Sequence, residues 1–317
     1  MKKKLKINLE LEDKIAIVFV LIIGIVYLAA LLTHSIKYKE FTKLSPILFY
    51  YFLFPFFLVL LKETVVLIFS DKYKLSKIIN TFRDWFPFLL IIAMYYSLND
   101  GLGYFITLHD KDIFLAHLDD IIFRVKLSVY LNDLYHNPLF INWLSFTYFM
   151  FVPLPPLVVG YFYFKGMRAQ FKVIMFSLVL MEAAGCIGYL TVPAIGPLYA
   201  FPEWYHVDIY NSAFSEWVRA MDNYSRLPRD SFPSLHVGIS AVIYFLSWRY
   251  SKKVFIITSP IILSMWFACI YLRHHYTVDV AAGLILAFAI YHFSVKYIEP
   301  YYKRRLNDEE PSEKTST

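Results

Sequence analysis

The feature that most constrains this fold is a series of long apolar stretches. A bilayer core about 30 Å thick requires roughly 20 apolar residues per helix. Eight stretches approach that length: 15–33, 46–69, 84–107, 139–164, 172–192, 235–250, 254–272 and 277–298. Only 18% of the 317 residues are charged, which is too few for the surface of a soluble domain of this size. The sequence therefore predicts an all-α polytopic membrane bundle of about eight transmembrane helices.

Two of these stretches carry internal breaks. The segment NDGLG at 99–103 interrupts the third stretch, which predicts a short span followed by an interfacial helix. Pro153, Pro155 and Pro156 lie inside the fourth, so we expect it to kink or break there. The first stretch follows the basic MKKKLK and has no small-residue cleavage site after it, so we interpret it as an uncleaved span.

The distribution of lysine and arginine predicts the orientation. With both termini in the cytoplasm, about two thirds of the 31 basic residues fall on the cytoplasmic side. The stretches that begin at 235 and at 277 then both start at the outer face. Polar residues about forty positions apart in the sequence should therefore lie on the same side of the membrane, at the same depth.

The first of two polar motifs at these helix starts is RHHYTVDV, which contains His275 and Asp279. Residues at i and i+4 share a helix face, so Asp279 can accept a hydrogen bond from one imidazole nitrogen of His275. Such a bond fixes the tautomer and raises the basicity of the other nitrogen, which can then attack phosphorus. His274 has Val278 at its i+4 position, so the spacing favours His275 as the nucleophile.

The second motif, DSFPSLHVGIS, contains His236. A histidine opposite the first one could protonate a leaving alkoxide. Ser234 and the backbone amides of 234–236, Leu235 included, lie at a helix N-terminus, where donors and the helix dipole favour an anion. Arg229 and Arg273 could neutralise phosphoryl oxygens with their planar guanidinium groups.

Each of these residues also has an ordinary structural explanation. A histidine or arginine at a membrane rim commonly lies at the interface, and Pro-Ser at a helix start commonly caps it. Asp279 is harder to explain in this way, because an unpaired acid among apolar neighbours is costly. Two such clusters on one side, with complementary chemistry, favour a site.

Other features support fewer conclusions. Cys186 and Cys269 lie in apolar stretches, as small buried side chains do. Asp119-Asp120 could bind a divalent ion, but no further ligands follow at motif spacing. No basic stripe with interleaved aromatic residues indicates nucleic-acid binding. The outer-loop aromatic residues suit either an interfacial belt or a lipid entrance: Tyr189, Tyr199, Trp204, Tyr205 and Trp217.

Taken together, FPSLH and YLRHHYTVDVAAG resemble the type 2 phosphatidic acid phosphatase superfamily, and most closely its inositol phosphorylceramide synthase and sphingomyelin synthase branch. VPAIGPLY at 192–199 is similar to the first motif of bacterial members, and the resemblance covers roughly 140–298. It implies a phosphohistidine on His275, with Asp279 as its orienting partner and His236 as the acid. It implies no metal and no cofactor.

The sequence departs from the superfamily pattern at several positions. Leu235 replaces the usual glycine between the serine and the histidine. The serine-arginine pair that precedes the third motif would fall at Ala268-Cys269, so Arg273 is the substitute we expect. The phosphatases' Lys-x6-Arg-Pro motif is absent; Arg219-x6-Arg226-Leu-Pro has similar spacing but lies only seven residues before Pro233. These departures favour a head-group transferase over a phosphatidate phosphatase.

We therefore expect three parts along the chain. Residues 1–138 form N-terminal membrane segments and an outer loop, and residues 139–298 form a phosphatase- or phosphotransferase-like domain with at least six helices in its core. Residues 299–317 form a cytoplasmic tail whose disorder is indicated most clearly from residue 306. The expected function is phosphate-linked head-group transfer between lipids at the outer face of a cell membrane. A lipid phosphate phosphatase is the first alternative. A transporter or lipid-binding protein is another, which should place charges at mid-membrane and show an inverted repeat.

Overall fold

Every regular element in the described part of the chain is a helix. The structure is a computed structural model that describes residues 9–32, 55–65, 68, 73–98, 109–134 and 137–309. Within these ranges, four helices are long and apolar enough to cross a membrane: Ile78–Tyr96, Arg168–Thr191, Lys252–Tyr271 and Thr277–Asp308. The predicted all-α polytopic membrane bundle is confirmed.

The fourth apolar stretch breaks where the prolines predict it. Helix α8 (Pro138–Phe149) and helix α9 (Leu154–Phe164) meet at a bend of 55°, and together they would make a fifth span. Pro153 has no backbone N–H to donate and lies between the two helices, so the first helix cannot continue through it.

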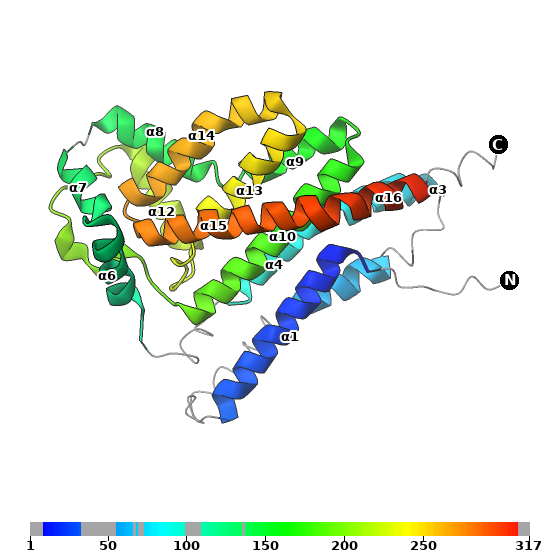
Figure 1. Cartoon of the computed structure of the whole chain (residues 1–317), viewed down its shortest axis with the longest axis horizontal. Coiled ribbons are helices and arrows are strands. Elements are labelled where there is room, and N and C mark those ends of the chain that lie inside the picture. Colours follow the sequence, from blue (N-terminus) through cyan, green and yellow to red (C-terminus); the bar gives the residue numbers. More distant parts are fainter. Residues whose placement is uncertain are drawn as a thin grey trace.

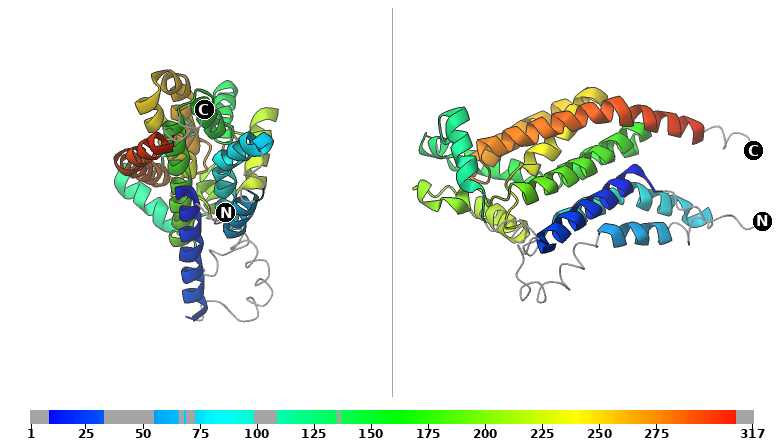
Figure 2. Two further views of the ribbon diagram at one scale, coloured as in Figure 1. Left: turned by 90° about the vertical axis from the view of Figure 1, so that its right-hand side faces the viewer. Right: turned by 60° about the horizontal axis from the view of Figure 1, so that its bottom comes forward.

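The long helices of the second half form the centre of the bundle. They are α10 (Arg168–Thr191), α13 (Leu235–Tyr250), α14 (Lys252–Tyr271) and α15 (Thr277–Phe293), which continues through a π turn into α16 (Glu299–Glu309). Figure 1 shows α13 between α10 and α14, and Figure 2 shows α10 running beside the continuous α15–α16 helix. With 16 residues, α13 is shorter than the other spans of this group.

Three shorter helices cover one end of this bundle (Figure 1). They are α6 (Asp112–Phe123), α7 (Leu127–Leu134) and α12 (Ala213–Ser225). The loop between α10 and α12 contains only the short α11 (Pro197–Ala200) and a 3₁₀ turn at Pro202–Trp204. Both polar motifs of the sequence open helices at this same end.

The N-terminal helices pack on α10. They include α1 (Leu11–Leu32), a helix over 55–65, α3 (Tyr73–Trp85) and α4 (Pro87–Tyr96). Ala16 and Phe19 of α1 belong to the same buried cluster as Val173 and Ile174 of α10. This packing crosses the domain boundary predicted at 138–139, and the boundary itself stays a prediction.

Two predictions at the chain's margins have different outcomes. Helix α16 spans Glu299–Glu309, so the disorder predicted for 299–317 is wrong for residues 299–309; Arg305, bonded to Glu10 at 2.7 Å, anchors this helix to the N-terminal part. Residues 99–103, the predicted break in the third stretch, and 310–317 lie outside the described residues.

The α13–α15 crossing requires a glycine. A Cβ atom added at Gly283 of α15 would lie 2.6 Å from the backbone oxygen of Ser234, the residue that precedes α13. This contact is too short for a side chain, and the opposing atom is backbone that cannot rotate away. The glycine therefore lets the two helix starts approach each other.

We predict that Gly283→Ala destabilises the fold by about 1–3 kcal/mol, because it forces these helices apart. Thermal unfolding in detergent measures the effect. Gly160→Ala is the matched control, since its added Cβ would meet Trp85 at an ordinary 3.5 Å. Equal stability of the two variants would contradict the close crossing.

Candidate active site

The two polar motifs meet where α13 and α15 begin. The backbone N–H of Ser234 donates to the carbonyl oxygen of Asp279 at 3.1 Å, which joins the two helix starts directly. The rings of His236 and His275 have centroids 5.7 Å apart at an interplanar angle of 60°. The structure thus brings together the two histidines that the sequence pairs across forty residues.

A serine mediates the contact between His275 and Asp279. The Nδ1 atom of His275 lies 2.9 Å from the carbonyl oxygen of Ser231 but 3.6 Å from Oδ2 of Asp279, too far for the direct hydrogen bond that the spacing predicts. The Ser231 hydroxyl donates to that same Oδ2 at 2.6 Å. Sequence reasoning missed Ser231, because a serine in a loop carries no motif signal of its own.

This arrangement fixes the tautomer of His275. A carbonyl oxygen can only accept, so Nδ1 must carry the proton that it donates to Ser231. In the neutral ring, Nε2 then has a free lone pair. No hydrogen bond to Nε2 is found within the described ranges, so the nitrogen that can act as a nucleophile is not occupied by another side chain.

The predicted anion-binding turn is engaged in helix contacts. Ser234 is fully buried, and its hydroxyl caps α13 by accepting from the N–H of Val237 at 3.4 Å. Leu235 fills the space left by Gly185 of α10, which explains how a leucine fits where the superfamily has glycine. The phosphate-binding role of this turn stays a prediction.

The two predicted arginines lie in different surroundings. Arg229 pairs with Asp110 at 2.5 Å. Arg273 has a left-handed backbone with φ +70°, donates to the carbonyl of Val207 at 2.5 Å and stacks on Tyr205 at 4.3 Å. Their contact with phosphate also stays a prediction.

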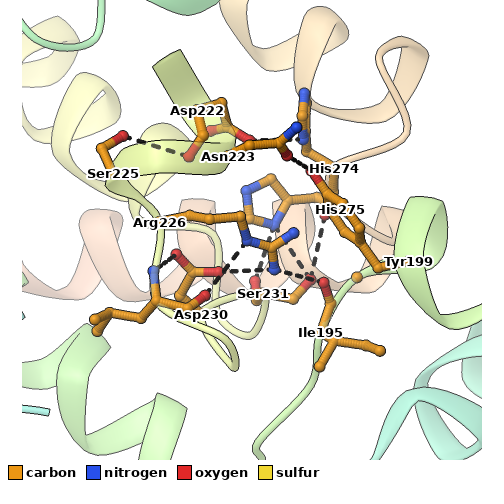
Figure 3. A network of polar contacts seen from close by, with 12 residues as sticks. Ile195, Tyr199, Asp222, Asn223, Ser225, Arg226, Asp230, Ser231, His274 and His275 are labelled. Atoms are coloured by element: carbon orange, nitrogen blue, oxygen red, sulfur yellow. Dashed lines mark hydrogen bonds and ion pairs between the residues drawn. The ribbon is translucent and has the colours of Figure 1, made fainter. Parts of the chain in front are cut away.

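A third arginine belongs to the polar network that contains His275. Figure 3 draws Arg226 in this network. It donates to the Ile195 carbonyl at 2.7 Å, pairs with Asp230 at 3.2 Å and lies 4.1 Å from the centre of the Tyr199 ring. In the sequence, Arg226 is indicated by the spacing Arg219-x6-Arg226-Leu-Pro.

The segment VPAIGPLY at 192–199 forms another part of the site, and its Tyr199 hydroxyl donates to the Asn223 side chain of α12. Gly196 has φ +89°, and a Cβ atom there would lie 2.5 Å from the carbonyl oxygen of His274, so this turn requires glycine. The N–H of Leu198 donates to the carbonyl of Arg273 at 2.9 Å, and the N–H of Ser231 donates to that of Ala194 at 3.1 Å. The loop therefore holds both polar motifs in place.

Two aspartates of α6 fix this assembly from outside. Asp112 accepts from the backbone N–H groups of Ile195 and Gly196, both at 3.0 Å, and from the Tyr276 hydroxyl at 2.8 Å. Asp119 accepts from the N–H groups of Thr277 and Val278 at 2.9 and 2.8 Å, which caps α15 from another helix. Burial raises the pKa of both carboxyl groups.

Asp119 and Asp120, which the sequence offers together as ligands for a divalent ion, bind different partners. Asp119 uses both oxygens on backbone amides, while Asp120 pairs with Lys126 at 3.2 Å. Among the described residues, no group of three or more His, Cys, Asp or Glu side chains is arranged to hold a metal ion. The adjacent carboxylates thus have separate structural partners.

A family model with the description PAP2 superfamily matches residues 115–293, more than half of the chain. The chain belongs to the PAP2 superfamily. The match begins inside α6, earlier than the predicted start at 140, and so includes Asp119. It also covers both histidine motifs.

Known relatives agree with the predicted branch. The chain is 25% identical over 162 residues to the phosphoinositol dihydroceramide synthase of Bacteroides thetaiotaomicron, which covers 44% of this chain and 50% of that protein. It is 31% identical over 94 residues to the inositol phosphorylceramide synthase of Candida albicans, covering 29% of this chain and 18% of that protein. The chain spans half or less of the length of these relatives, and no solved structure matches it. The resemblance to the synthase branch is confirmed.

We predict that Asp119→Asn lowers the stability of the outer end by about 1–2 kcal/mol, because an amide NH₂ would face a backbone N–H and the charge at the helix N-terminus would be lost. Thermal unfolding in detergent measures it. Asp120→Asn is the control and should change stability by less than about 0.5 kcal/mol, since its ion pair is solvent-accessible. A larger effect at Asp120 would argue against the cap.

Proposed function

We propose that this multi-pass membrane protein is a lipid phosphotransferase that forms a phosphohistidine at His275. The observation that carries the proposal is the pair of facing imidazoles, 5.7 Å apart, in which the Nδ1 proton of His275 is held by Ser231. Membership of the PAP2 superfamily and the names of the synthase relatives support the same chemistry.

The proposed reaction has two steps. The Nε2 lone pair of His275 attacks phosphorus, the bond from phosphorus to the lipid oxygen breaks, and His236 gives its proton to the departing alkoxide. In the second step, His236 takes the proton of an acceptor hydroxyl, whose oxygen attacks phosphorus while the phosphorus–nitrogen bond breaks. Asp279, through Ser231, stabilises the positive charge that His275 develops.

Positive groups around the histidines would bind the phosphoryl oxygens. Arg226 is the leading candidate because it belongs to the same polar network as His275, which Figure 3 draws. Arg229, Arg273, Ser234 and the amide of Leu235 remain predicted ligands.

The acceptor decides the outcome of the reaction. The synthase relatives carry names that favour a phosphoinositol donor and a ceramide-type acceptor, so we propose transfer between lipids. The distribution of basic residues places the reaction at the outer face of the cell membrane. Water attacking the same intermediate would make the protein a phosphatase, which is the second candidate because it requires no change in the site.

The product of the reaction tests this proposal. Purified protein in nanodiscs receives labelled phosphatidate, phosphatidylinositol or phosphatidylinositol phosphate, with and without ceramide or diacylglycerol, and products are read by mass spectrometry. We expect a new phospholipid only when an acceptor is present. Free phosphate alone would indicate a phosphatase. No product from any donor would favour a transporter or lipid-binding protein.

We predict that His275→Ala abolishes product formation while thermal stability stays near that of the wild type. The parallel variant His274→Ala removes an adjacent imidazole without removing the proposed nucleophile, so it should still trap labelled phosphate on the protein. Full turnover by His275→Ala would show that the nucleophile is another residue.

Asp279→Asn should reduce turnover by about 10²–10⁴-fold with little change in size or position of the side chain. The amide cannot supply the negative charge that opposes a cationic His275, and it competes as a donor with the Ser231 hydroxyl. Steady-state rates with the best donor measure the loss. An unchanged rate would reduce Asp279 to a structural link between helices.

A further inference from the structure

A tyrosine lies between two histidines at the inner wall of the site. The ring of Tyr148 on α8 stacks on His236 with centroids 4.3 Å apart and an interplanar angle of 17°. Its other face stacks on His274 at 4.6 Å and 19°. Phe151 covers His236 as well, at 4.2 Å and 37°. The three stacked rings come from three different segments of the chain.

One carboxyl group holds two rings of this stack. The Tyr148 hydroxyl donates to Oδ1 of Asp222 at 3.0 Å, and Nδ1 of His274 lies 3.3 Å from Oδ2 of the same residue. Asp222 belongs to α12, which covers the outer end of the bundle. His274, which has no partner at i+4, therefore has one from a different helix.

The hydrogen bonds around His274 indicate how many protons His274 and Asp222 share. The Tyr210 hydroxyl donates to the carbonyl of Leu272 at 2.8 Å, so its oxygen accepts from Nε2 of His274 at 3.2 Å. A single further proton then lies between Nδ1 and Asp222, and the pair has no net charge wherever that proton lies. Burial raises the pKa of Asp222 and lowers the pKa of His274, which favours the uncharged form of each.

His236 is held in a different way from His275. His275 has hydrogen-bonded neighbours at Nδ1, whereas no hydrogen bond to the His236 ring is found in the part of the chain that the structure describes. Its direction is set by the flat aromatic faces of Tyr148 and Phe151. Both ring nitrogens stay free to exchange protons with substrate, while the ring plane is fixed.

We propose that Tyr148 is a positioning residue for His236, itself held in place by Asp222 and His274. The inference rests on the proposed function, in which His236 protonates the leaving alkoxide. A ring that loses its stacking partner can turn about its side-chain bonds, and a misplaced acid transfers its proton less efficiently. Tyr148 therefore matters for the protonation step and leaves the attack by His275 unaffected.

The leaving group distinguishes these two steps. Phosphatidylinositol and the nitrophenyl ester of inositol phosphate transfer the same group, but the first releases an alkoxide that needs a proton and the second releases nitrophenolate, which does not. We expect Tyr148→Leu to reduce the rate of transfer from the lipid donor by about 10–100-fold. With the nitrophenyl ester, the release of nitrophenolate in the first turnover precedes the step in which His236 activates the acceptor. This first-turnover rate should fall by less than about threefold, as it should with His236→Ala.

A double-mutant cycle tests whether Tyr148 acts through His236. In the His236→Ala background, adding Tyr148→Leu should cause no further loss with the lipid donor, because the residue it positions is already absent. A further loss equal to that of the single variant would overturn the proposal, as would equal losses with the two donors. The same cycle with Tyr148→Met, a flexible apolar side chain, applies where Tyr148→Leu lowers the melting temperature.

Two variants control for general disruption. Phe146→Leu removes a ring from the same helix whose neighbour is Trp143 at 5.8 Å, and it should leave both rates unchanged. Tyr148→Phe keeps the ring and should lose less than Tyr148→Leu; equal losses would assign the effect to the hydroxyl and contradict positioning by stacking. His275→Ala distinguishes a failure of the proposed function from a failure of the positioning role. If His275→Ala retains turnover, the proposed function fails. If His275→Ala is inactive but the losses from Tyr148→Leu and His236→Ala are additive, only the positioning role is refuted.

Discussion

The geometry of the site depends on one buried carboxylate, that of Asp279. Its Oδ2 atom accepts from the Ser231 hydroxyl and from the N–H of Tyr276, and its carbonyl oxygen accepts from the N–H of Ser234. A buried charge is tolerated only where such donors replace water. The Ser231 donor comes from the loop before α13 and the Tyr276 donor from the start of α15, so the carboxylate joins these two segments. The bond from Ser234 to the backbone carbonyl of the same aspartate adds the start of α13. The position of His275 follows from this arrangement, because its Nδ1 atom bonds to the carbonyl of the same Ser231.

Carboxylates of α6 stabilise backbone N–H groups in the same way. The turn at Gly196 and the first turn of α15 expose N–H groups that have no partner within their own segments, and membrane surroundings would make them costly to leave unpaired. Asp112 and Asp119 of α6 bind these groups. Helix α6 thus does more than connect two membrane spans. It fixes the distance between the segment VPAIGPLY and the start of α15. The family match begins at residue 115 and includes Asp119 of this helix.

The sequence predicts the meeting of His236 and His275 because topology alone places two helix starts on one side of the membrane. The bend in the fourth apolar stretch is equally predictable, since proline acts locally. The partners that hold the site are not predictable in this way. Asp119 binds backbone N–H groups 158 and 159 positions away, and an amide donor has no sequence signature. Ser231 contributes a carbonyl that any residue would have. The direction of an arginine depends on backbone angles and on packing partners, so spacing left Arg226 undecided among several candidates.

The N-terminal helices lie outside the family match, yet they support the structure that positions it. Buried or half-buried ion pairs fasten them to the rest of the bundle at the end away from the histidines: Glu10 with Arg305, and Asp84 with Lys172. A third pair, Asp13 with Lys62, joins two of the N-terminal helices to each other. Apolar side chains of α1 and α4 share one buried cluster with α10. Helix α10 in turn presents Gly185 to Leu235, the residue next to His236. A rigid α10 is needed for this contact, because a leucine beside the site leaves no space for a helix that shifts. The N-terminal segments therefore support the position of Leu235 through packing, at a distance from both histidines.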